Sequence, residues 1–105
     1  MAIPAATPRD ERRFGREAVA FTIEGFGPDA QRLAIDVTNL SPEGLMGHSP
    51  AILARGDRLR LKLPVVGVVA AEVRWFEAHR IGCRFDAALD RATFYELLAA
   101  VVRLA

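Results

Sequence analysis

Apolar and polar residues alternate along much of this chain with a period of two. Because successive side chains of a β-strand point to opposite faces of a sheet, this period predicts strands with one buried face. Alternation is clearest in the segments 19–24, 32–38, 58–63 and 81–86. A long run rich in β-branched residues covers 65–75, and one more short strand is expected near Leu45. The pattern therefore predicts about six strands.

Near the C-terminus the spacing of apolar residues changes to three and four positions, which places them on one face of a helix. These residues are Phe94, Leu97, Leu98, Val101 and Leu104. Asp90 or Thr93 is expected to cap the helix, and Glu96 has the spacing of a capping box with Thr93. Short antiparallel strands followed by one such helix predict a mainly β fold, a six-stranded antiparallel β-barrel whose C-terminal α-helix covers an opening or a flank.

The 105 residues fit a single domain with one hydrophobic core. Residues 1–8 include two prolines and mostly small side chains, so they are expected to form a flexible tail, and the domain is predicted to span 9–105. The opening residues lack the long apolar run of a signal peptide, and no segment is apolar enough to span a bilayer. Cys83 is the single cysteine, which excludes an internal disulfide. A cytoplasmic protein without membrane insertion is therefore expected.

Acidic and basic residues nearly balance, with a net charge of +1, and 51% of the residues are hydrophobic. This composition excludes a disordered chain and argues against a long nucleic acid as partner, because non-specific duplex binding depends on a large positive excess. Of the 14 basic residues only Lys62 is a lysine. The planar fork of arginine suits phosphates and guanine edges, but a GC-rich genome also favours arginine codons, so only the placement of particular arginines is informative.

Three arginines, Arg12, Arg13 and Arg16, lie between the expected tail and the first predicted strand. A lead-in segment of this kind can close over a ligand, and each guanidinium can form two charge-assisted hydrogen bonds with a small, doubly charged anion. The alternative is a solvated basic cluster, since such clusters are common. The segment is therefore a candidate anion-binding element.

A second candidate is the turn 39–44, Asn-Leu-Ser-Pro-Glu-Gly, which follows the second predicted strand. In a purely structural turn, the Asn39 and Ser41 side chains satisfy local backbone groups, and Gly44 is expected to adopt backbone angles that other residues avoid. In a ligand site, Asn39 and Ser41 offer hydrogen-bonding groups to a base or a phosphate, and Gly44 lets the backbone approach the ligand closely. These residues alone leave both interpretations open.

Together the two motifs resemble the PilZ family, which has Arg-x-x-x-Arg before the first strand and Asp/Asn-x-Ser-x-x-Gly roughly two dozen residues later. Arg12 and Arg16 match the first motif, and Asn39, Ser41 and Gly44 match the second. The resemblance covers nearly all of the chain after the expected tail. It implies a six-stranded barrel that binds the bacterial second messenger cyclic di-GMP, often as a stacked pair of molecules, with the arginine segment wrapped around the ligand.

The resemblance also implies a role for each arginine. Arg12 and Arg16 hold the phosphates and guanine edges, and a bidentate contact of an arginine with guanine O6 and N7 is worth about 1–3 kcal/mol. Arg13 adds charge or stacking. In some relatives an extra basic residue directly before the first motif arginine favours the stacked pair, but this chain has Glu11 there. The stoichiometry and affinity of ligand binding are therefore left open.

Trp75, the only tryptophan, ends the long apolar run. In relatives that this chain resembles, an aromatic residue at this place stacks on a guanine, so Trp75 is a candidate ligand contact. Its parity, however, matches that of Val69, Ala71 and Val73, which are expected to face inward. Parity therefore favours a core or rim position for this tryptophan.

The sequence has no credible catalytic or metal-binding constellation. His48 and His79 have no carboxylate or cysteine at a ligand-like spacing, and Ser41 lacks the surroundings of a nucleophile elbow. We therefore expect no enzyme activity, cofactor or metal. The expected function is that of a stand-alone cyclic di-GMP receptor or adaptor that acts on an effector protein still to be identified. The alternatives are a PilZ-like interaction module with weak or no nucleotide binding, and a small barrel that binds single-stranded nucleic acid.

Overall fold

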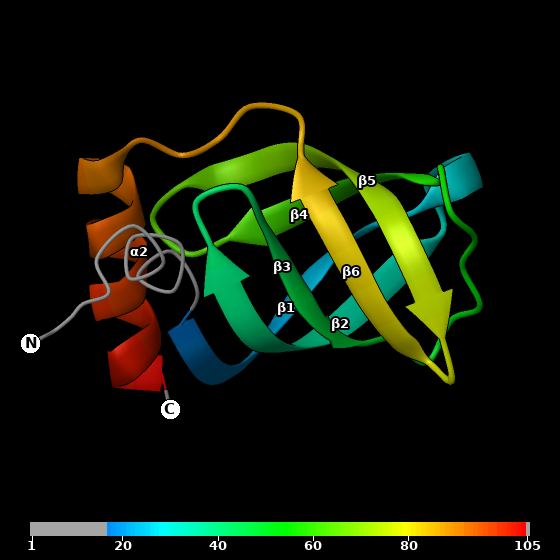
Figure 1. Cartoon of the computed structure of the whole chain (residues 1–105), viewed down its shortest axis with the longest axis horizontal. Helices are drawn as coiled ribbons and strands as arrows, with labels where there is room; N and C mark the ends of the chain where they lie inside the picture. Colours follow the sequence, from blue (N-terminus) through cyan, green and yellow to red (C-terminus); the bar gives the residue numbers. More distant parts are fainter. Residues whose placement is uncertain (1–16, 105) are drawn as a thin grey trace, which may run out of the picture.

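Strands and helices account for most of residues 17–104, the part of the chain that the computed structural model describes. In chain order they are β1 (Glu17–Phe26), the short 3-10 helix η1 (Pro28–Ala30), β2 (Arg32–Ser41), β3 (Gly44–His48), β4 (Arg58–Leu63), β5 (Gly67–Glu77), β6 (Arg80–Phe85) and α2 (Arg91–Leu104). The strands pair antiparallel into a closed barrel in the order β1-β2-β3-β6-β5-β4, and α2 stands at one end of it (Figure 1). This confirms the predicted fold class. The expected tail at 1–8 and the expected domain start at Arg9 lie outside the described residues.

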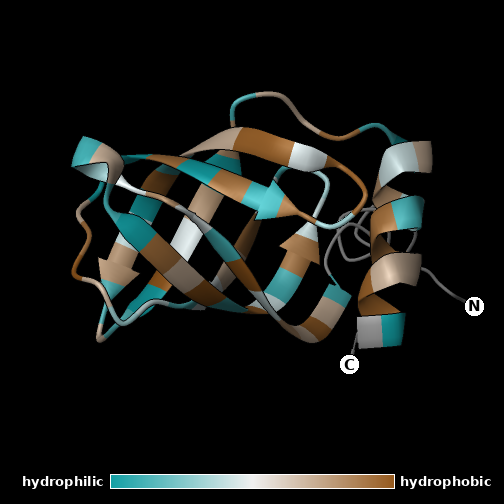
Figure 2. Cartoon of the chain, turned by 180° about the vertical axis from the view of Figure 1, so that it is seen from behind, coloured by the Kyte–Doolittle hydropathy of each residue, from teal (hydrophilic) through white to brown (hydrophobic). Residues whose placement is uncertain are grey.

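The barrel interior is filled by alternate side chains of the strands. In β4, Leu61 is fully buried (0% exposed) and Leu59 and Leu63 are nearly so, whereas Arg60 and Lys62 on the other face are exposed. Figure 2 shows hydrophobic and hydrophilic residues alternating along the strands. Burial of each leucine contributes about 1.5–3 kcal/mol relative to leaving it in water. The period of two that predicted this strand therefore separates its inner and outer faces.

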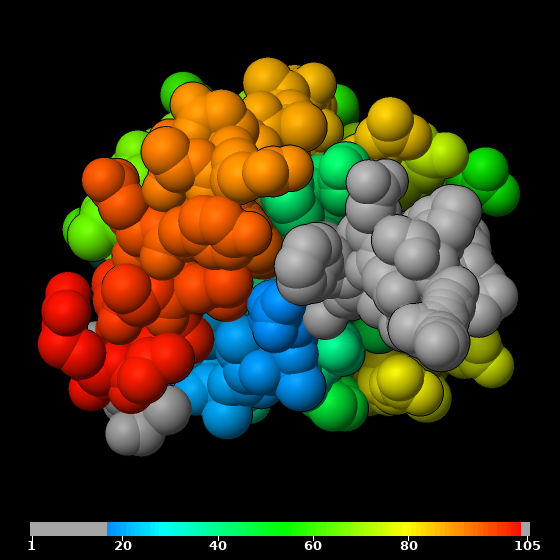
Figure 3. All heavy atoms as spheres, turned by 60° about the vertical axis from the view of Figure 1, so that its left-hand side comes forward, coloured from blue at the N-terminus to red at the C-terminus, as the bar shows by residue number. Residues whose placement is uncertain are grey.

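The C-terminal helix begins directly after Asp90. The Asp90 carboxylate accepts a hydrogen bond from the Thr93 amide (2.7 Å), and the Asp90 carbonyl accepts one from the Phe94 amide (2.9 Å). Asp90 is therefore the N-cap, and the alternative of a cap at Thr93 with a capping box from Glu96 is wrong, because Thr93 lies inside the first helical turn. The buried face of α2 packs beside the first residues of β1 (Figure 3).

Strand β5 is shifted relative to the predicted run 65–75. The first two residues of that run belong to the turn from β4, where Val65 has a positive φ of 57° and the Val66 amide donates a hydrogen bond to the Pro64 carbonyl (2.6 Å). The strand therefore begins at Gly67 and continues two residues past the tryptophan.

A β-bulge in β5 reverses the direction in which Trp75 points. Val73 and Trp75 pair with consecutive residues of β6, so Arg74 is an extra residue in the ladder. Because strand side chains alternate, one extra residue exchanges the inner and outer faces. Val73 is buried, but Trp75 faces outward and is 39% exposed. The prediction that Trp75 shares an inward face with Val69, Ala71 and Val73 is therefore wrong.

A second bulge has the same effect on Asn39. Val37 and Asn39 pair with consecutive residues of β3, so Thr38 is the extra residue, and β1 is irregular opposite the same position. Val37 and Leu40 are both buried even though they are three positions apart. Asn39 consequently points to the outer surface, where its side chain is partly exposed. Both bulges thus move a predicted ligand residue to the outside of the barrel.

Candidate functional site

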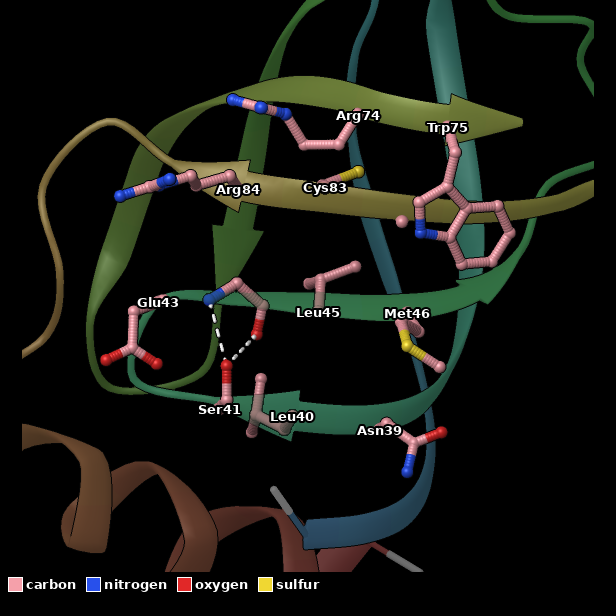
Figure 4. Close-up of a pocket in the computed structure, with 12 residues that line it drawn as sticks. Asn39, Leu40, Ser41, Glu43, Leu45, Met46, Arg74, Trp75, Cys83 and Arg84 are labelled. Carbon is pink, nitrogen blue, oxygen red and sulfur yellow. Dashed lines mark hydrogen bonds between the residues drawn. The ribbon is translucent and has the colours of Figure 1, made fainter. Parts of the chain in front are cut away.

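A hollow of about 350 Å³ lies on the outer surface of the barrel, over the pairing of β3 with β6 and flanked by β2 and β5 (Figure 4). We refer to it as the β3–β6 hollow. Four of the residues predicted for the ligand site line it, namely Asn39, Ser41, Gly44 and Trp75. Three others lie outside the described residues, namely Arg12, Arg13 and Arg16. Both bulged strands therefore contribute to one hollow.

The turn between β2 and β3 is closed by the side chain of Ser41. Its hydroxyl accepts a hydrogen bond from the Gly44 amide (3.2 Å) and donates one to the Gly44 carbonyl (3.3 Å) (Figure 4). Ser41 and Gly44 are also the last paired residues of the two strands, so Pro42 and Glu43 alone form the loop. The structural role expected for Ser41 is confirmed, and its hydroxyl proton is already engaged.

Gly44 is required by the close approach of β6 and not by its own backbone angles. Its φ does not lie in the left-handed region, so the expectation of unusual backbone angles at this glycine is wrong. A Cβ atom at this position would collide with the carbonyl oxygen of Cys83 and lie 3.0 Å from its carbonyl carbon. Backbone atoms of a paired strand cannot move aside without disturbing the ladder. The space left by the missing side chain is therefore taken by β6.

Asn39 lies toward the end of the hollow that is distant from the turn (Figure 4). Its Oδ1 accepts a hydrogen bond from the Thr38 hydroxyl (3.3 Å), and its amide nitrogen has no hydrogen-bond partner among residues 17–104. An asparagine amide carries two donor hydrogens. The Asn39 side chain can therefore donate to an acceptor on a ligand.

The indole of Trp75 lies directly over Gly82 of β6. A Cβ atom at position 82 would overlap the pyrrole edge of the ring, with Cδ1 at 2.8 Å, so a glycine is needed to hold the indole in this position. A partly exposed aromatic ring beside polar groups can stack on a nucleobase. Gly82 was not singled out from the sequence, although a glycine inside a strand is typical of a close approach of this kind.

Two arginines that were not predicted as site residues also line the hollow. Arg74 is the bulged residue of β5, and Arg84 lies opposite Gly44 where β6 pairs with β3. Both side chains are exposed and extend toward the same side in Figure 4, that of the β2–β3 turn. The Arg74 guanidinium also contacts the Glu72 carboxylate at 3.9 Å. The hollow therefore has an aromatic end at Trp75 and, near the turn, a charged end with two arginines and the Glu43 carboxylate.

The strand β1 begins next to the second motif. Glu17 pairs with Leu40, and Ala18 pairs with Asn39. Arg16 directly precedes Glu17 in the sequence. The chain therefore enters the barrel beside the residues that line one edge of the β3–β6 hollow.

Cys83 borders the hollow, and its side chain is buried. Burial raises the pKa of its thiol to about 12, so the thiol stays protonated at neutral pH. The thiolate is the form that acts as nucleophile and metal ligand. Within the residues that the structure describes, no group of three or more His, Cys, Asp or Glu side chains could hold a metal ion.

The fold and the hollow together define a class of protein, a six-stranded closed β-barrel with a C-terminal helix and a surface hollow that has one aromatic wall. No family model matches the chain, and no curated protein matches it. Across residues 17–104, none of the helices is long and apolar enough to cross a membrane.

Proposed function

We propose that the chain is a cyclic di-GMP receptor whose ligand binds at the β3–β6 hollow. The observation that carries this proposal is the convergence of Asn39, Ser41, Gly44 and Trp75 on one hollow. The first three form the motif that resembles the PilZ family. Trp75 of β5 lies beside them because the bulge in β5 turns its side chain outward, as the bulge in β2 does for Asn39. In the sequence the arginine motif ends at Arg16, directly before β1, and the first residues of β1 pair with Leu40 and Asn39 of the same hollow.

The chemistry of the hollow suits a cyclic dinucleotide, which has two guanine bases and two phosphates. The indole of Trp75 offers a face for stacking, which is worth about 1–3 kcal/mol per base. Asn39 offers amide hydrogens to base or phosphate acceptors. Arg74 and Arg84 bring positive charge to the side where phosphates can lie, and charge-assisted hydrogen bonds are about twice as strong as neutral ones.

In this proposal the arginines that precede β1 complete the site. Arg12 is five residues from Glu17, so even a fully extended chain reaches at most about 18 Å from the start of the strand. Arg12 and Arg16 bind guanine edges or phosphates through their forks, and Arg13 adds charge. A ligand held this way joins the leading segment to the barrel surface. An effector protein distinguishes this ligand-bound surface from the ligand-free surface, so the chain acts as a stand-alone receptor or adaptor.

Isothermal titration of the purified protein with cyclic di-GMP tests this proposal. We expect saturable heat at micromolar ligand in low salt, and weaker binding as the salt concentration rises, because the contacts are charge-assisted. Titration with GMP is the control for non-specific nucleotide binding and should give no saturable heat. A folded protein that gives no heat with cyclic di-GMP would contradict the proposal.

One observation favours a second function. Ser41 is bonded to Gly44 within the turn, and Gly44 is needed for packing against β6, so both motif residues have a structural purpose without any ligand. The chain would then be a PilZ-like protein-interaction module that binds no nucleotide. Recovery of the same partner protein in equal amounts with and without cyclic di-GMP, together with a silent titration, would support this alternative.

A further inference from the structure

A second and larger depression lies on the opposite side of the barrel. Its volume is about 1250 Å³, and it lies over the seam where β1 pairs with β4, with β2 and β5 on either side. We refer to it as the β1–β4 groove. In the closed strand order, the β1–β4 and β3–β6 pairings are farthest apart, and no described residue lines both depressions. Figure 1 looks onto β3 and β6, with β1 behind them. The groove is therefore separate from the site of the proposed function.

The centre of the groove is a phenyl ring between two arginines. Phe26 of β1 pairs with Arg32 of β2 on one side and with Arg60 of β4 on the other. Residues directly opposite each other in antiparallel strands have Cβ atoms about 4.5–5.5 Å apart, so these three side chains form one row on the outer surface. Phe26 is 43% exposed. The row thus presents an apolar ring that has a guanidinium on either side.

The next row extends this surface. Glu24 of β1 lies between Ala34 of β2 and Lys62 of β4, and Lys62 in turn pairs with Val68 of β5, which is 65% exposed. Ala34 and Ala70 contribute only methyl groups to the lining of the groove. The groove therefore combines exposed apolar side chains with long cationic ones that rise beside them.

Positive charge in the groove exceeds negative charge. Its charged residues are four cations, Arg32, Arg58, Arg60 and Lys62, and two carboxylates, Glu24 and Asp29. Arg58 forms an ion pair with Asp86, but within residues 17–104 no carboxylate forms an ion pair with the other three cations. The net charge of the whole chain is only +1. Cations that form no ion pair with the described carboxylates are therefore concentrated around the exposed phenyl ring.

We propose that the β1–β4 groove binds an acidic segment of a partner protein. An apolar side chain of the partner covers Phe26 and Val68, and acidic residues on either side of it pair with Arg32 and Arg60. Carboxylates match the guanidinium fork in bidentate geometry, which fixes the orientation of the segment. Burial of the phenyl ring supplies the apolar part of the interaction. Charge complementarity and the exposed ring together define this occupant.

Three other occupants fit the groove less well. Small-molecule sites usually have volumes of about 300–1000 Å³, which this groove exceeds. Single-stranded nucleic acid stacks successive bases on several aromatic rings, whereas Phe26 is the one aromatic residue among the described lining. A second copy in a two-fold dimer whose axis passes through Phe26 would set the arginines of one copy, Arg32 and Arg60, against the arginines of the other.

Selection from a random dodecapeptide phage library on the immobilised protein, without cyclic di-GMP, tests this proposal. We expect the enriched peptides to be net negative and to carry an aromatic or aliphatic residue flanked by Asp or Glu. A synthetic enriched peptide should shift the backbone amide resonances of residues 24–34, 58–62 and 68–70. Its Kd should rise at least about tenfold in the Arg32→Glu/Arg60→Glu variant, because two charge pairs are reversed. Phe26→Ala, which keeps all charges, should also weaken binding.

Arg91→Glu/Arg103→Glu is the matched control, because it makes the same charge change on α2 and should leave the Kd unchanged. Enrichment of neutral or basic peptides, or resonance shifts over the β3–β6 hollow, would overturn the proposal. So would an oligothymidylate that displaces the peptide and binds more tightly, or a dimer in light scattering that Arg60→Glu dissociates. Since no cyclic di-GMP is used, this experiment and the titration of the proposed receptor can fail independently.

Discussion

Around the β3–β6 hollow the strands are irregular, whereas around the β1–β4 groove they pair in regular register. Bulges turn Asn39 and Trp75 outward at the hollow, and Gly44 and Gly82 allow close approaches there. At the groove, Phe26 faces outward by simple alternation along β1. Bulges are over-represented next to functional sites because they redirect side chains. The comparison indicates that bulges redirect side chains at the hollow, whereas the strand side chains of the groove face outward by regular alternation. A close approach at a glycine occurs on both faces, because a Cβ atom at Gly25 of β1 would collide with the Arg60 carbonyl oxygen of β4.

Among the substitutions that test this comparison, Gly44→Val is expected to have the largest effect. A Cβ atom there already collides with the Cys83 carbonyl, so β3 must move away from β6. We expect the free energy of unfolding, measured by urea denaturation, to fall by about 3 kcal/mol, the upper end of typical overpacking effects. Gly27→Val on the groove side is the control, because its nearest neighbour is the Leu33 side chain at 3.2 Å, which can adjust. Equal losses in the two variants would show that contact with the Cys83 backbone is not what makes Gly44 necessary.

Arg16→Ala is expected to have the next largest effect, and it sharpens the assignment of the nucleotide to one face. Loss of charge-assisted hydrogen bonds should weaken cyclic di-GMP binding by about 1.5–3 kcal/mol in isothermal titration. Arg60→Ala removes the same side chain type from the groove and should leave this affinity unchanged. Wild-type affinity in the Arg16 variant would show that the arginine assignment is wrong, and a loss confined to the Arg60 variant would move the nucleotide to the groove.

Trp75→Ala compares the single exposed aromatic residue of the hollow with that of the groove. Loss of base stacking should weaken cyclic di-GMP binding by about 1–3 kcal/mol, while Trp75→Phe should retain most of the affinity. Phe26→Ala is the matched change in the groove and should not alter nucleotide binding. If the Trp75 and Phe26 variants bind cyclic di-GMP equally well, stacking at the hollow plays no part.

Asp90→Asn is expected to have the smallest effect and provides a reference outside both faces. Hydrogen bonds from the Thr93 backbone and side chain lower the pKa of Asp90, so its contribution to stability is complete above the unfolded pKa and is lost as the pH falls through the folded value. Asparagine caps helices equally well without titrating. The melting temperature of the wild type should therefore fall relative to that of the variant as the pH drops through the lowered pKa of Asp90, and parallel curves would show that Asp90 has no such role.

The strands were predictable because most of the ladder is regular. In β4, Leu59, Leu61 and Leu63 alternate with charged residues, and this pattern corresponds directly to an inner and an outer face. Alternation predicted the wrong face for Trp75, because a single extra residue in β5 reverses the inner and outer faces and has no recognisable signal in the sequence. The choice between Asp90 and Thr93 as helix cap likewise depended on hydrogen bonds that spacing does not determine.

The candidate site was predictable only where its residues are close in sequence. Asn39, Ser41 and Gly44 belong to one short motif and can be recognised together. Arg74 and Arg84 reach the same hollow because β6 pairs with both β3 and β5, and such non-local pairing is not visible in a single segment. The β1–β4 groove was missed for the same reason, since its cations are distributed over two different strands.

The position of Trp75 over Gly82 has a practical consequence. Because the chain has no other tryptophan, its tryptophan fluorescence, when excited selectively, originates from the β3–β6 side of the barrel. A purine that stacks on the indole quenches this emission, whereas a peptide in the opposite groove leaves it unaltered. The protein thus contains a built-in optical reporter that distinguishes occupancy of one face from occupancy of the other.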